Sequence, residues 1–331
     1  MKGMISMEYT SENLESISIE ITKLCNLNCK FCYASSNQVN KEEQYITDDQ
    51  LQRVVEQIKK NKIKKVRLTG GEPLLKHELF YRIIKILNEN NITINLNTNL
   101  SLIDDEIAKE IKDYIGSEFY VFTSLLSPVE KTCDSITGVK GSYKKIIEGM
   151  NCCKRNGLKL SVNFTISKDN ISDLDLIYDF VKKYKIDRTS ISAVIPPVYD
   201  RYSDINKLSD QDITNIANML VKINRELHIP VTSSHTLPLC IIGNRPEYKL
   251  IESQRCRAGY NYCCINLHSG NVFACSQENR DYGNIYQKDL YDIWLEMKKE
   301  HSDTNLKLMC QNCELLDECG GMCKWSSCSS C

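Results

Sequence analysis

Short runs of β-branched and aromatic residues alternate with amphipathic segments through the first two thirds of the chain. The runs predict six strands, at Ser16–Thr22, Lys65–Thr69, Thr93–Thr98, Phe119–Ser124, Lys159–Ile166 and Arg188–Ile195. Between them, apolar residues recur every three or four positions and predict helices at Asp48–Lys60, Leu79–Glu89, Asp104–Tyr114, Tyr143–Asn156 and Ser172–Tyr184. Thr47 is the expected N-cap of the first helix. Regular alternation of strand and helix is typical of parallel β/α units, so we predict an α/β fold, a partial (β/α)6 TIM-like barrel.

The alternation stops after a predicted helix at Asp210–Glu226. Beyond it we predict a hairpin between Tyr262 and Cys275, turning at residues 269–271, and then a helix at Leu290–Lys299. The terminal segment that follows is rich in cysteine and poor in regular signals.

This change of pattern predicts two domains. Residues 1–235 would form the barrel, and residues 236–331 would form a small cysteine-rich domain. The terminal segment has too few apolar residues to build a core of its own.

The composition limits the possible partners. The chain has 331 residues, 42% of them apolar, which is enough to bury a large core. Lys and Arg total 42 against 43 Asp and Glu, so no overall basic field would gather nucleic acid or an anionic membrane surface. The N-terminus lacks the apolar core of a signal peptide, and no apolar run approaches membrane-spanning length. We expect a cytoplasmic protein with neither nucleic acid nor membrane as a partner.

Cysteine is unusually frequent, with 17 residues. Disulfides are a poor explanation, because the cytosol keeps thiols reduced and a core of this size needs no covalent staples. The odd number, and the crowding of cysteines into residues 25–32 and 256–331, favour metal ligation. A secreted disulfide-bonded domain is the less favoured alternative.

Three cysteines follow the first predicted strand, namely Cys25, Cys29 and Cys32, and we call residues 25–32 the cysteine loop. Thiolates are the ligands that iron–sulfur clusters select. Three thiolates cannot complete the ligand set of a 4Fe-4S cluster, so one iron would be left open for chemistry. Ferredoxin-type runs supply a full set, and zinc sites pair two close cysteines with a distant second pair.

The cysteine loop resembles that of the radical S-adenosylmethionine (SAM) enzymes, with Phe31 in their aromatic position before the third cysteine. The sequence Gly70-Gly71-Glu72-Pro73, here called the glycine turn, follows the second predicted strand, as in that family. The resemblance implies that the three thiolates hold one 4Fe-4S cluster, whose fourth iron is chelated by the amino and carboxylate groups of SAM. The glycines would let the backbone approach the cofactor, and Pro73 would fix the turn.

The same resemblance implies further SAM contacts at the strand ends. Ser124 and Asn163 would contact its ribose or carboxylate, and Val194 with Ile195 would pack on its adenine. The implied cofactor-binding set is Phe31, Gly70, Gly71, Glu72, Pro73, Ser124, Asn163 and Val194. Strand termini and core are the alternative interpretation of Ser124, Asn163 and Val194.

The C-terminal region resembles the SPASM extension of these enzymes, which has a seven-cysteine pattern. The pattern here is Cys256-x13-Gly270-x4-Cys275, then Cys310-x2-Cys313-x5-Cys319-x3-Cys323, then a last cysteine. The resemblance implies two auxiliary 4Fe-4S clusters, one on Cys256, Cys275 and Cys323 and the other on Cys310, Cys313 and Cys319. The expected fourth ligands are Cys263 for the first and Cys331 for the second, with Cys264 and Cys328 as alternatives. A zinc ribbon is the alternative for the terminal cysteines.

The segment Asp134–Ser142 resembles peptide-modifying members of the superfamily, which narrows the expected substrate class. Cys275 is followed by Ser276, where sulfatase-maturating enzymes carry an aspartate proposed as a base, and this difference counts against sulfatase activation. Only 24 residues precede Cys25, fewer than the ~50 of a small domain, so we expect any leader peptide to be recognised by a separate protein.

Four cysteines fall outside both patterns: Cys133, Cys152, Cys153 and Cys240. We expect Cys152 and Cys153 to be small buried residues of a helix. Cys133, in the loop after the fourth strand, would face the barrel mouth, and Cys240 would lie at the domain junction. Either could donate a hydrogen atom or contact substrate, although ordinary packing is the favoured interpretation of each.

Together these features predict a radical SAM oxidoreductase that acts as a peptide maturase. It would cleave the sulfonium bond of SAM with one electron, and the 5'-deoxyadenosyl radical would modify a ribosomal peptide (RiPP) or protein. We expect hydrogen abstraction followed by a thioether or carbon–carbon cross-link. The implied cofactors are three 4Fe-4S clusters and SAM. Reduced ferredoxin or flavodoxin is the expected electron donor, because iron–sulfur potentials reach about −700 mV.

Three other functions stay open. The first is peptide epimerisation with a cysteine hydrogen donor such as Cys133 or Cys240. The second is maturation of a metallocofactor or small molecule. The third is a non-catalytic iron–sulfur electron carrier, against which the glycine turn argues.

Overall fold

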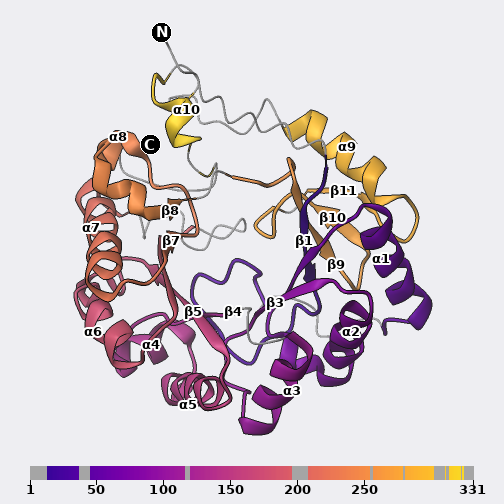
Figure 1. Ribbon diagram of the computed structural model, residues 1–331, viewed down its shortest axis with the longest axis horizontal. Helices are drawn as coiled ribbons and strands as arrows, with labels where there is room; N and C mark the ends of the chain where they lie inside the picture. Colours follow the sequence, from indigo (N-terminus) through magenta and orange to yellow (C-terminus); the bar gives the residue numbers. More distant parts are fainter. Residues whose placement is uncertain are drawn as a thin grey trace.

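Parallel strands form the inner layer of the molecule, and helices cover their outer side. This computed structural model describes residues 13–36, 45–115, 120–195, 208–253, 256–278, 280–301, 310, 313–321 and 323. The strands are β1 (Ser16–Glu20), β2 (Lys65–Thr69), β3 (Thr93–Asn97), β4 (Tyr120–Ser124), β5 (Lys159–Ile166), β6 (Arg188–Ala193), β7 (Val231–Ser233), β8 (Ile251–Ser253), β9 (Tyr262–Asn266), β10 (Asn271–Phe273) and β11 (Asp281–Asn284). The helices are α1 (Asp48–Lys60), α2 (His77–Glu89), α3 (Asp105–Ile115), α4 (Glu130–Thr137), α5 (Ser142–Arg155), α6 (Leu176–Lys183), α7 (Asp210–Leu227), α8 (Leu239–Ile242), α9 (Leu290–His301) and α10 (Leu316–Cys319). Figure 1 shows the strands inside an open ring of helices.

The described strands join into one sheet in the order β11-β10-β9-β1-β2-β3-β4-β5-β6-β7-β8. Pairing is parallel from β9 through β1 to β8, and antiparallel where β10 and β11 are added at one edge. The six predicted strands are β1 to β6, in sequence order, so the predicted partial barrel is confirmed. The short strands β7 and β8, which the sequence did not predict, extend it beyond β6.

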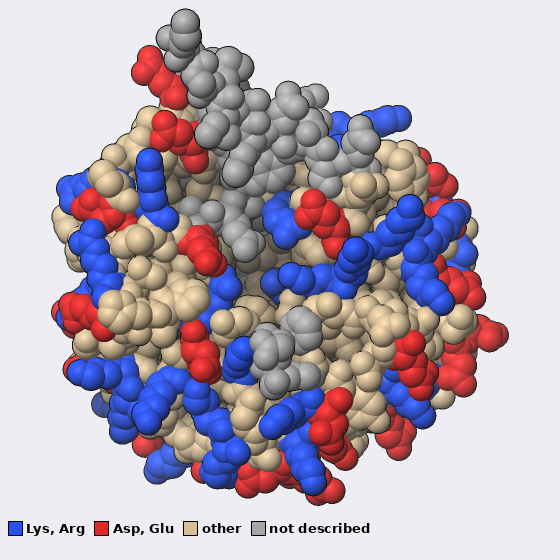
Figure 2. Space-filling model, viewed as in Figure 1, with Lys and Arg blue, Asp and Glu red and all other residues tan. Residues whose placement is uncertain are grey.

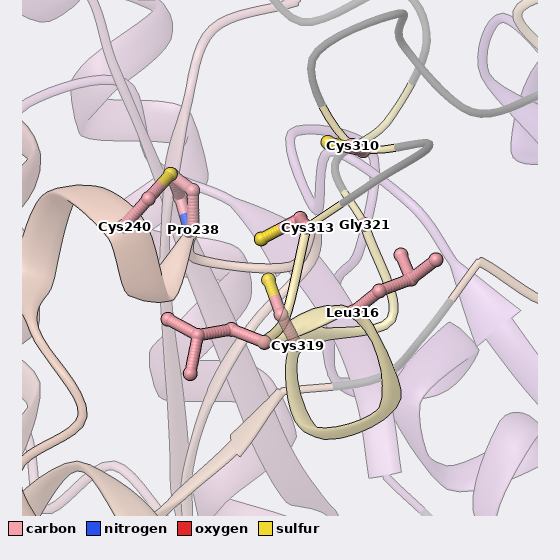
Figure 3. A pocket seen from close by; sticks show the side chains of 8 residues that line it. Pro238, Cys240, Cys310, Cys313, Leu316, Cys319 and Gly321 are labelled. Carbon is pink, nitrogen blue, oxygen red and sulfur yellow. The ribbon is translucent and has the colours of Figure 1, made fainter.

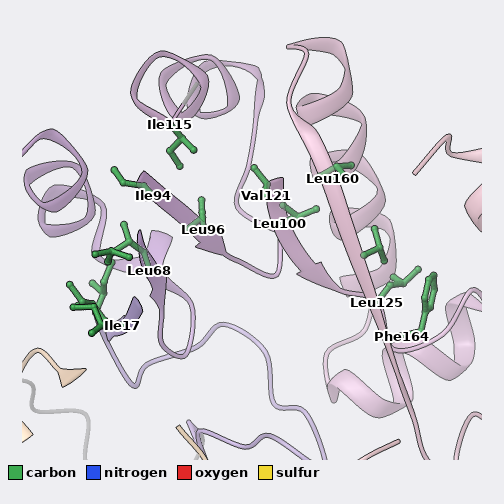
Figure 4. Close-up of a cluster of buried hydrophobic side chains, with 14 of the residues drawn as sticks. Ile17, Leu68, Ile94, Leu96, Leu100, Ile115, Val121, Leu125, Leu160 and Phe164 are labelled. Carbon is green, nitrogen blue, oxygen red and sulfur yellow. The ribbon is translucent and has the colours of Figure 1, made fainter. Parts of the chain in front are cut away.

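Alternate side chains of each strand face opposite sides of the sheet, one set toward the helices and the other toward the barrel interior. Ile17 of β1, Leu68 of β2 and Leu96 of β3 are fully buried among apolar side chains on the helix side (Figure 4). Burial of this aliphatic surface stabilises the barrel by roughly 25 cal/mol per Å². The intervening positions are polar and face the barrel interior, where the Tyr262 hydroxyl donates to Ser18 Oγ at 2.7 Å. The interior is therefore available for polar chemistry.

The helices begin and end close to the predicted positions, with two exceptions. Thr47 caps α1 as expected, because its Oγ1 atom accepts from the Gln50 N–H at 3.2 Å and the Gln50 side chain accepts from the Thr47 N–H. The helix predicted at Ser172–Tyr184 is interrupted: a 3-10 turn covers Ile171–Asp173, and α6 begins only at Leu176. The segment after β4, predicted to be a loop, forms helix α4, so that prediction was wrong.

The C-terminal region continues the barrel sheet. The predicted hairpin forms from β9 and β10, with Gly270 in the left-handed region at φ +76°. Strand β9 pairs in parallel with β1, from Ser16 opposite Tyr262 to Glu20 opposite Asn266. The sheet is thus continuous across residues 235 and 236, and the division into two domains stays a prediction.

The surface carries both signs of charge. On the face seen in Figure 2, basic and acidic side chains are interspersed around a central hollow. None of the helices within the described ranges is long and apolar enough to cross a membrane.

Candidate active site

The cysteine loop follows β1 directly and lies at the carboxyl end of the parallel strands. Its three thiols are partly buried. The Leu27 N–H donates to Cys25 Sγ at 3.4 Å, and the Cys32 N–H donates to the Cys29 carbonyl at 3.2 Å. These local bonds fold eight residues into a compact turn that keeps the sulfur atoms on one loop.

Helix α4 holds the cysteine loop from the other side of the barrel mouth. The Asn28 N–H donates to the Thr137 carbonyl at 2.8 Å, and the Lys30 N–H donates to the Ile136 carbonyl at 3.0 Å. A Cβ atom on Gly138 would lie 2.8 Å from the Asn28 carbonyl oxygen, so only glycine permits this approach. The carbonyls at the C-terminal end of α4 therefore satisfy the loop backbone.

Asp134 joins α4 to α5 and thereby supports the same contact. Its carboxylate accepts from the Gly141 N–H at 2.6 Å, from the Ser142 hydroxyl at 2.9 Å and from the Tyr143 N–H at 2.9 Å. The segment Asp134–Ser142, which the sequence linked to peptide-modifying enzymes, thus has a structural role in positioning the cysteine loop.

The glycine turn packs directly on the backbone that enters the cysteine loop. The Gly71 N–H donates to the Thr22 carbonyl at 2.7 Å, and the Glu72 N–H donates to the Leu24 carbonyl at 2.8 Å. A Cβ atom on Gly70 would lie 2.3 Å from the Thr22 carbonyl oxygen, and one on Gly71 would lie 2.1 Å from that of Leu24. Both glycines are therefore needed for this backbone contact.

Glu72 is fully buried and ties the end of β3 to the glycine turn. Its carboxylate accepts from the Leu74 N–H at 3.2 Å, from Thr98 Oγ1 at 2.7 Å and from the Asn99 N–H at 2.7 Å. Burial raises the pKa of the Glu72 carboxyl to about 7, although these hydrogen bonds lower it. The side chain thus orders the loop that follows β3.

Asn99, which the sequence did not single out, reaches from that loop to the cysteine loop. Its Nδ2 atom donates to the Asn26 Oδ1 atom at 2.8 Å and approaches Cys25 Sγ at 3.8 Å. The Asn26 amide in turn donates to the Ser101 hydroxyl at 2.8 Å. The sequence carries no signal for this contact, because Asn99 and Cys25 lie on different β/α units and meet only in the folded barrel.

The thiols of Cys25 and Cys29 need a positively charged partner to ionise. Burial raises the pKa of Cys25 to about 11, and burial with the neighbouring thiols of Cys32, Cys25 and Cys133 raises the pKa of Cys29 well above its usual range. A cationic iron core would offset both effects and stabilise the thiolates. The sulfur donors of the loop suit an iron–sulfur cluster.

Within the described ranges, no three His, Cys, Asp or Glu side chains converge on a single-ion position. The thiols of the cysteine loop would instead have the sulfide and iron core of a cluster between them. Cys25, Cys29 and Cys32 therefore fit the predicted cluster by the type of donor and by their common loop.

The other predicted SAM contacts occupy the barrel mouth and its wall. Ser124 is exposed at the end of β4 and lies opposite Asn163 of β5 in register. The Asn163 Oδ1 atom accepts from Ser192 and Ser234, each at 3.2 Å. These residues form a polar patch on the interior face of β4 to β6. In contrast, the structure places both Phe31 and Val194 in the hydrophobic core, 7% and 4% exposed.

The cysteines of β9 lie on opposite faces of the sheet. Cys263 is packed in the hydrophobic core, where burial alone raises its pKa to about 12. Cys264 lies on the interior face, where burial, then Glu20 and Cys275, raise the pKa of its thiol. Of the two cysteines predicted as fourth ligand of the first auxiliary cluster, Cys264 is the one whose thiol lies near Cys275.

The remaining C-terminal cysteines fall into two groups. Burial, together with the nearby thiols of Cys256 and Cys323, raises the pKa of Cys275 to about 12, although the hydrogen bond from the Gln277 N–H to Cys275 Sγ lowers it. Cys310, Cys313 and Cys319 line a separate hollow (Figure 3). This grouping agrees with the two sets that the resemblance implied. Cys328 and Cys331 lie outside the described residues.

The unassigned cysteines differ in their surroundings. Cys133 lies on α4 and is fully buried, so its predicted position in a loop was wrong, although its thiol lies near Cys29 of the cysteine loop. Cys152 and Cys153 are buried on α5, as predicted. Cys240 is exposed on α8.

An α/β partial barrel with three clustered thiols after its first strand defines a class of enzymes that hold an iron–sulfur cluster at the barrel mouth. The Radical SAM superfamily matches residues 19–181, so the chain carries a radical SAM domain, followed by a cysteine-rich region. Such a domain implies a SAM-binding 4Fe-4S cluster and SAM itself.

Known proteins resemble most of the chain. Fe-coproporphyrin III synthase of Methanosarcina barkeri is 22% identical over 95% of this chain and 84% of its own length. Radical SAM cyclopropyl synthase TigE of Paramaledivibacter caminithermalis is 26% identical over 97% of this chain and 70% of its own length. The crystal structure of Streptococcus suis SuiB bound to precursor peptide SuiA has a TM-score of 0.71 at 21% identity, covering 93% of this chain and 71% of that one. The likeness of the structures confirms the fold.

Proposed function

We propose that this protein is a radical SAM enzyme that modifies a ribosomal peptide or protein by hydrogen abstraction, closing a thioether or carbon–carbon cross-link. The observation that carries the proposal is the cysteine loop, held by the glycine turn on one side and by α4 on the other. When bound, the cluster and SAM would supply a 5'-deoxyadenosyl radical. The protein residues described above bind, orient and shield these groups.

Each part of the mouth has a distinct task in this proposal. Cys25, Cys29 and Cys32 hold the cluster, and Asn99 donates toward the Cys25 sulfur. The glycine turn and the patch of Ser124 and Asn163 bind SAM. The polar barrel interior receives the substrate, and the surrounding sheet excludes water from the radical. The C-terminal cysteines would hold two auxiliary clusters, which would supply an electron acceptor or a binding site for a substrate thiolate.

A peptide substrate is supported by two observations. SuiB, which shares this fold, is seen bound to a precursor peptide. The segment Asp134–Ser142 resembles peptide-modifying enzymes, and here it forms the junction that positions the cysteine loop. A carbon–carbon product has a counterpart in the cyclopropyl synthase. We propose a ferredoxin or flavodoxin as electron donor and a separate protein for leader recognition.

Maturation of a small molecule with carboxylate groups is the second candidate. Fe-coproporphyrin III synthase matches nearly the whole chain. Within the barrel, the Arg67 guanidinium lies over the Phe122 ring at 5.5 Å, and its Nε atom is buried without a hydrogen-bond partner. A substrate carboxylate would satisfy it.

The first experiment tests the radical chemistry. The reconstituted chain is incubated anaerobically with SAM and dithionite, and 5'-deoxyadenosine is measured by chromatography. We expect product from the wild type and none from Cys29→Ala, with Cys153→Ala as the control for a buried cysteine outside the loop. Equal yields from the wild type and Cys29→Ala would exclude this cluster site, and no 5'-deoxyadenosine from the wild type would favour a non-catalytic electron carrier.

The second experiment separates the substrate classes. Short peptides encoded beside the gene are co-expressed with the enzyme and analysed by mass spectrometry. Loss of two hydrogen atoms supports a cross-link, and unchanged mass with a D-residue supports epimerisation. Faster 5'-deoxyadenosine formation with a carboxylate-bearing iron tetrapyrrole, but not with the peptides, would overturn the peptide assignment.

A further inference from the structure

Helix α8 brings Cys240 to the hollow that contains the second group of C-terminal cysteines. The hollow is lined by Pro238, Cys240, Cys310, Cys313, Leu315, Leu316, Cys319 and Gly321. In Figure 3 the sulfur atom of Cys313 points toward the side on which α8 carries Cys240, and the sulfur atom of Cys319 points toward that of Cys313. Four thiols from two distant segments therefore share one small space.

The position of α8 is set by its own backbone bonds and by its neighbours. Pro238 precedes the helix, and its carbonyl accepts from the Ile241 N–H at 2.9 Å, while Ile242 is buried. The next residues form a direct link to the C-terminal segment, since Asn244 Nδ2 donates to Glu318 Oε2 at 2.7 Å. This hydrogen bond connects α8 to α10, which carries Cys319, and is independent of any metal.

The three C-terminal cysteines are also held by a local turn. The Cys313 N–H donates to the Cys310 carbonyl at 3.2 Å, and the Cys319 N–H donates to the Leu315 carbonyl at 2.8 Å. Leu315 and Leu316 give the hollow an apolar wall beside the thiols. Four cysteines in such surroundings are the usual complete ligand set of a 4Fe-4S cluster.

We propose that Cys240 is the fourth thiolate ligand of the auxiliary cluster held by Cys310, Cys313 and Cys319. The inference rests on the proposed function, because it concerns one of the auxiliary clusters of that function. The cluster then covalently links the α8 segment, which follows barrel strand β7, to the C-terminal segment. Cys240 then serves as a metal ligand and not as a hydrogen donor. The last cysteine, Cys331, is not required for this cluster.

The test measures iron and acid-labile sulfide per chain in the full-length protein after anaerobic reconstitution, with Mössbauer and electron paramagnetic resonance (EPR) spectra. Cys240→Ala, Cys331→Ala and the control Cys152→Ala are compared with the wild type. We expect Cys240→Ala to lose about four iron atoms per chain or to show a three-iron signal. Cys331→Ala and Cys152→Ala keep the wild-type content. Circular dichroism checks that each variant is folded, and Cys240 is exposed, so its truncation leaves the core intact.

A different pattern of iron content would overturn the assignment of Cys240 as the fourth ligand. This pattern is a wild-type iron content in Cys240→Ala together with a loss of iron in Cys331→Ala or Cys328→Ala. Cys310→Ala separates this failure from failure of the proposed auxiliary cluster. If Cys310→Ala loses iron and Cys240→Ala does not, only the role of Cys240 is wrong. If neither loses iron, or if the site contains zinc, there is no auxiliary iron–sulfur cluster in the hollow, and both proposals fail there.

Discussion

The side chain of Asn99 links the end of β3 to the first cysteine of the site: its Nδ2 atom lies 3.8 Å from Cys25 Sγ while it donates to the Asn26 Oδ1 atom at 2.8 Å. Asn99 is itself held by Glu72, whose carboxylate accepts from its N–H at 2.7 Å. The glycine turn and the cysteine loop are thus coupled through one amide side chain. Groups that orient metal ligands in this way usually matter nearly as much as the ligands.

Replacing Asn99 should weaken the cluster of the cysteine loop. In Asn99→Ala the Cys25 thiolate loses a hydrogen-bond donor. We therefore expect the protein to hold the iron of the cluster about 10- to 100-fold more weakly, as measured by competition with a chelator. The reduction potential should also become more negative, because hydrogen bonds to sulfur stabilise the reduced cluster. The measurement is an anaerobic EPR redox titration of the signal that responds to SAM. Asn156→Ala, at the end of α5, is the control, and an unchanged potential in Asn99→Ala would refute the coupling.

Gly71→Ala should disrupt the contact between the glycine turn and the cysteine loop. The added Cβ atom would lie 2.1 Å from the Leu24 carbonyl oxygen, which is backbone and cannot move aside easily. We expect the free energy of unfolding of the cluster-free protein to fall by about 3 kcal/mol or more, measured by urea denaturation. Gly141→Ala is the control, because its Cβ atom meets nothing within 4 Å and only the φ of +79° is strained, at about 1–2 kcal/mol. Equal losses in the two variants would contradict the close-contact explanation.

Gln57→Leu should loosen α9 from the barrel. Gln57 is 2% exposed, and its amide accepts from the Leu290 N–H at 2.9 Å and donates to Asp289 Oδ1 at 2.9 Å. Leucine leaves the buried Leu290 N–H without this acceptor, which destabilises by about 1–3 kcal/mol. Hydrogen exchange should accelerate at the start of α9. Gln52→Leu, on the exposed face of α1, should leave exchange there unchanged, and equal exchange in the wild type and Gln57→Leu would disprove the proposed docking.

The cluster-free protein should lose stability in mild acid through His235. Burial lowers the pKa of the His235 imidazole to about 4, and its Nδ1 atom is buried without a hydrogen-bond partner in the described structure. Below about pH 6.5 the unfolded chain takes up a proton that the folded chain does not, so the free energy of unfolding falls as the pH falls from 6.5 to 4. The loss is at most about 3 kcal/mol.

His235→Asn provides the comparison for this pH dependence. The difference in unfolding free energy between wild type and variant, measured by urea denaturation at several pH values, should decrease steadily between pH 6.5 and pH 4. A difference that does not change with pH would show that His235 titrates normally in the folded protein.

Most of the barrel could be predicted because its signals are local. In β2, Val66 and Leu68 alternate with Lys65 and Arg67, and this period of two identifies a strand with one apolar face. Helix α4 has a weaker signal. It is eight residues long with few buried positions, and its carbonyls are satisfied by the cysteine loop, which lies far away in the sequence. Short elements whose stability depends on residues distant in the sequence cannot be predicted from local sequence patterns.

The sequence by itself determined which residues can do the chemistry, because three cysteines within eight residues share one loop in any fold. Only the tertiary structure decided how distant residues meet: Asn99 with Cys25, Cys240 with Cys319, and Cys264 on the inner face of β9. The physical reason is that such meetings depend on strand order, register and the path of the crossover helices. These follow from packing of the whole chain, and no local run of residues specifies them.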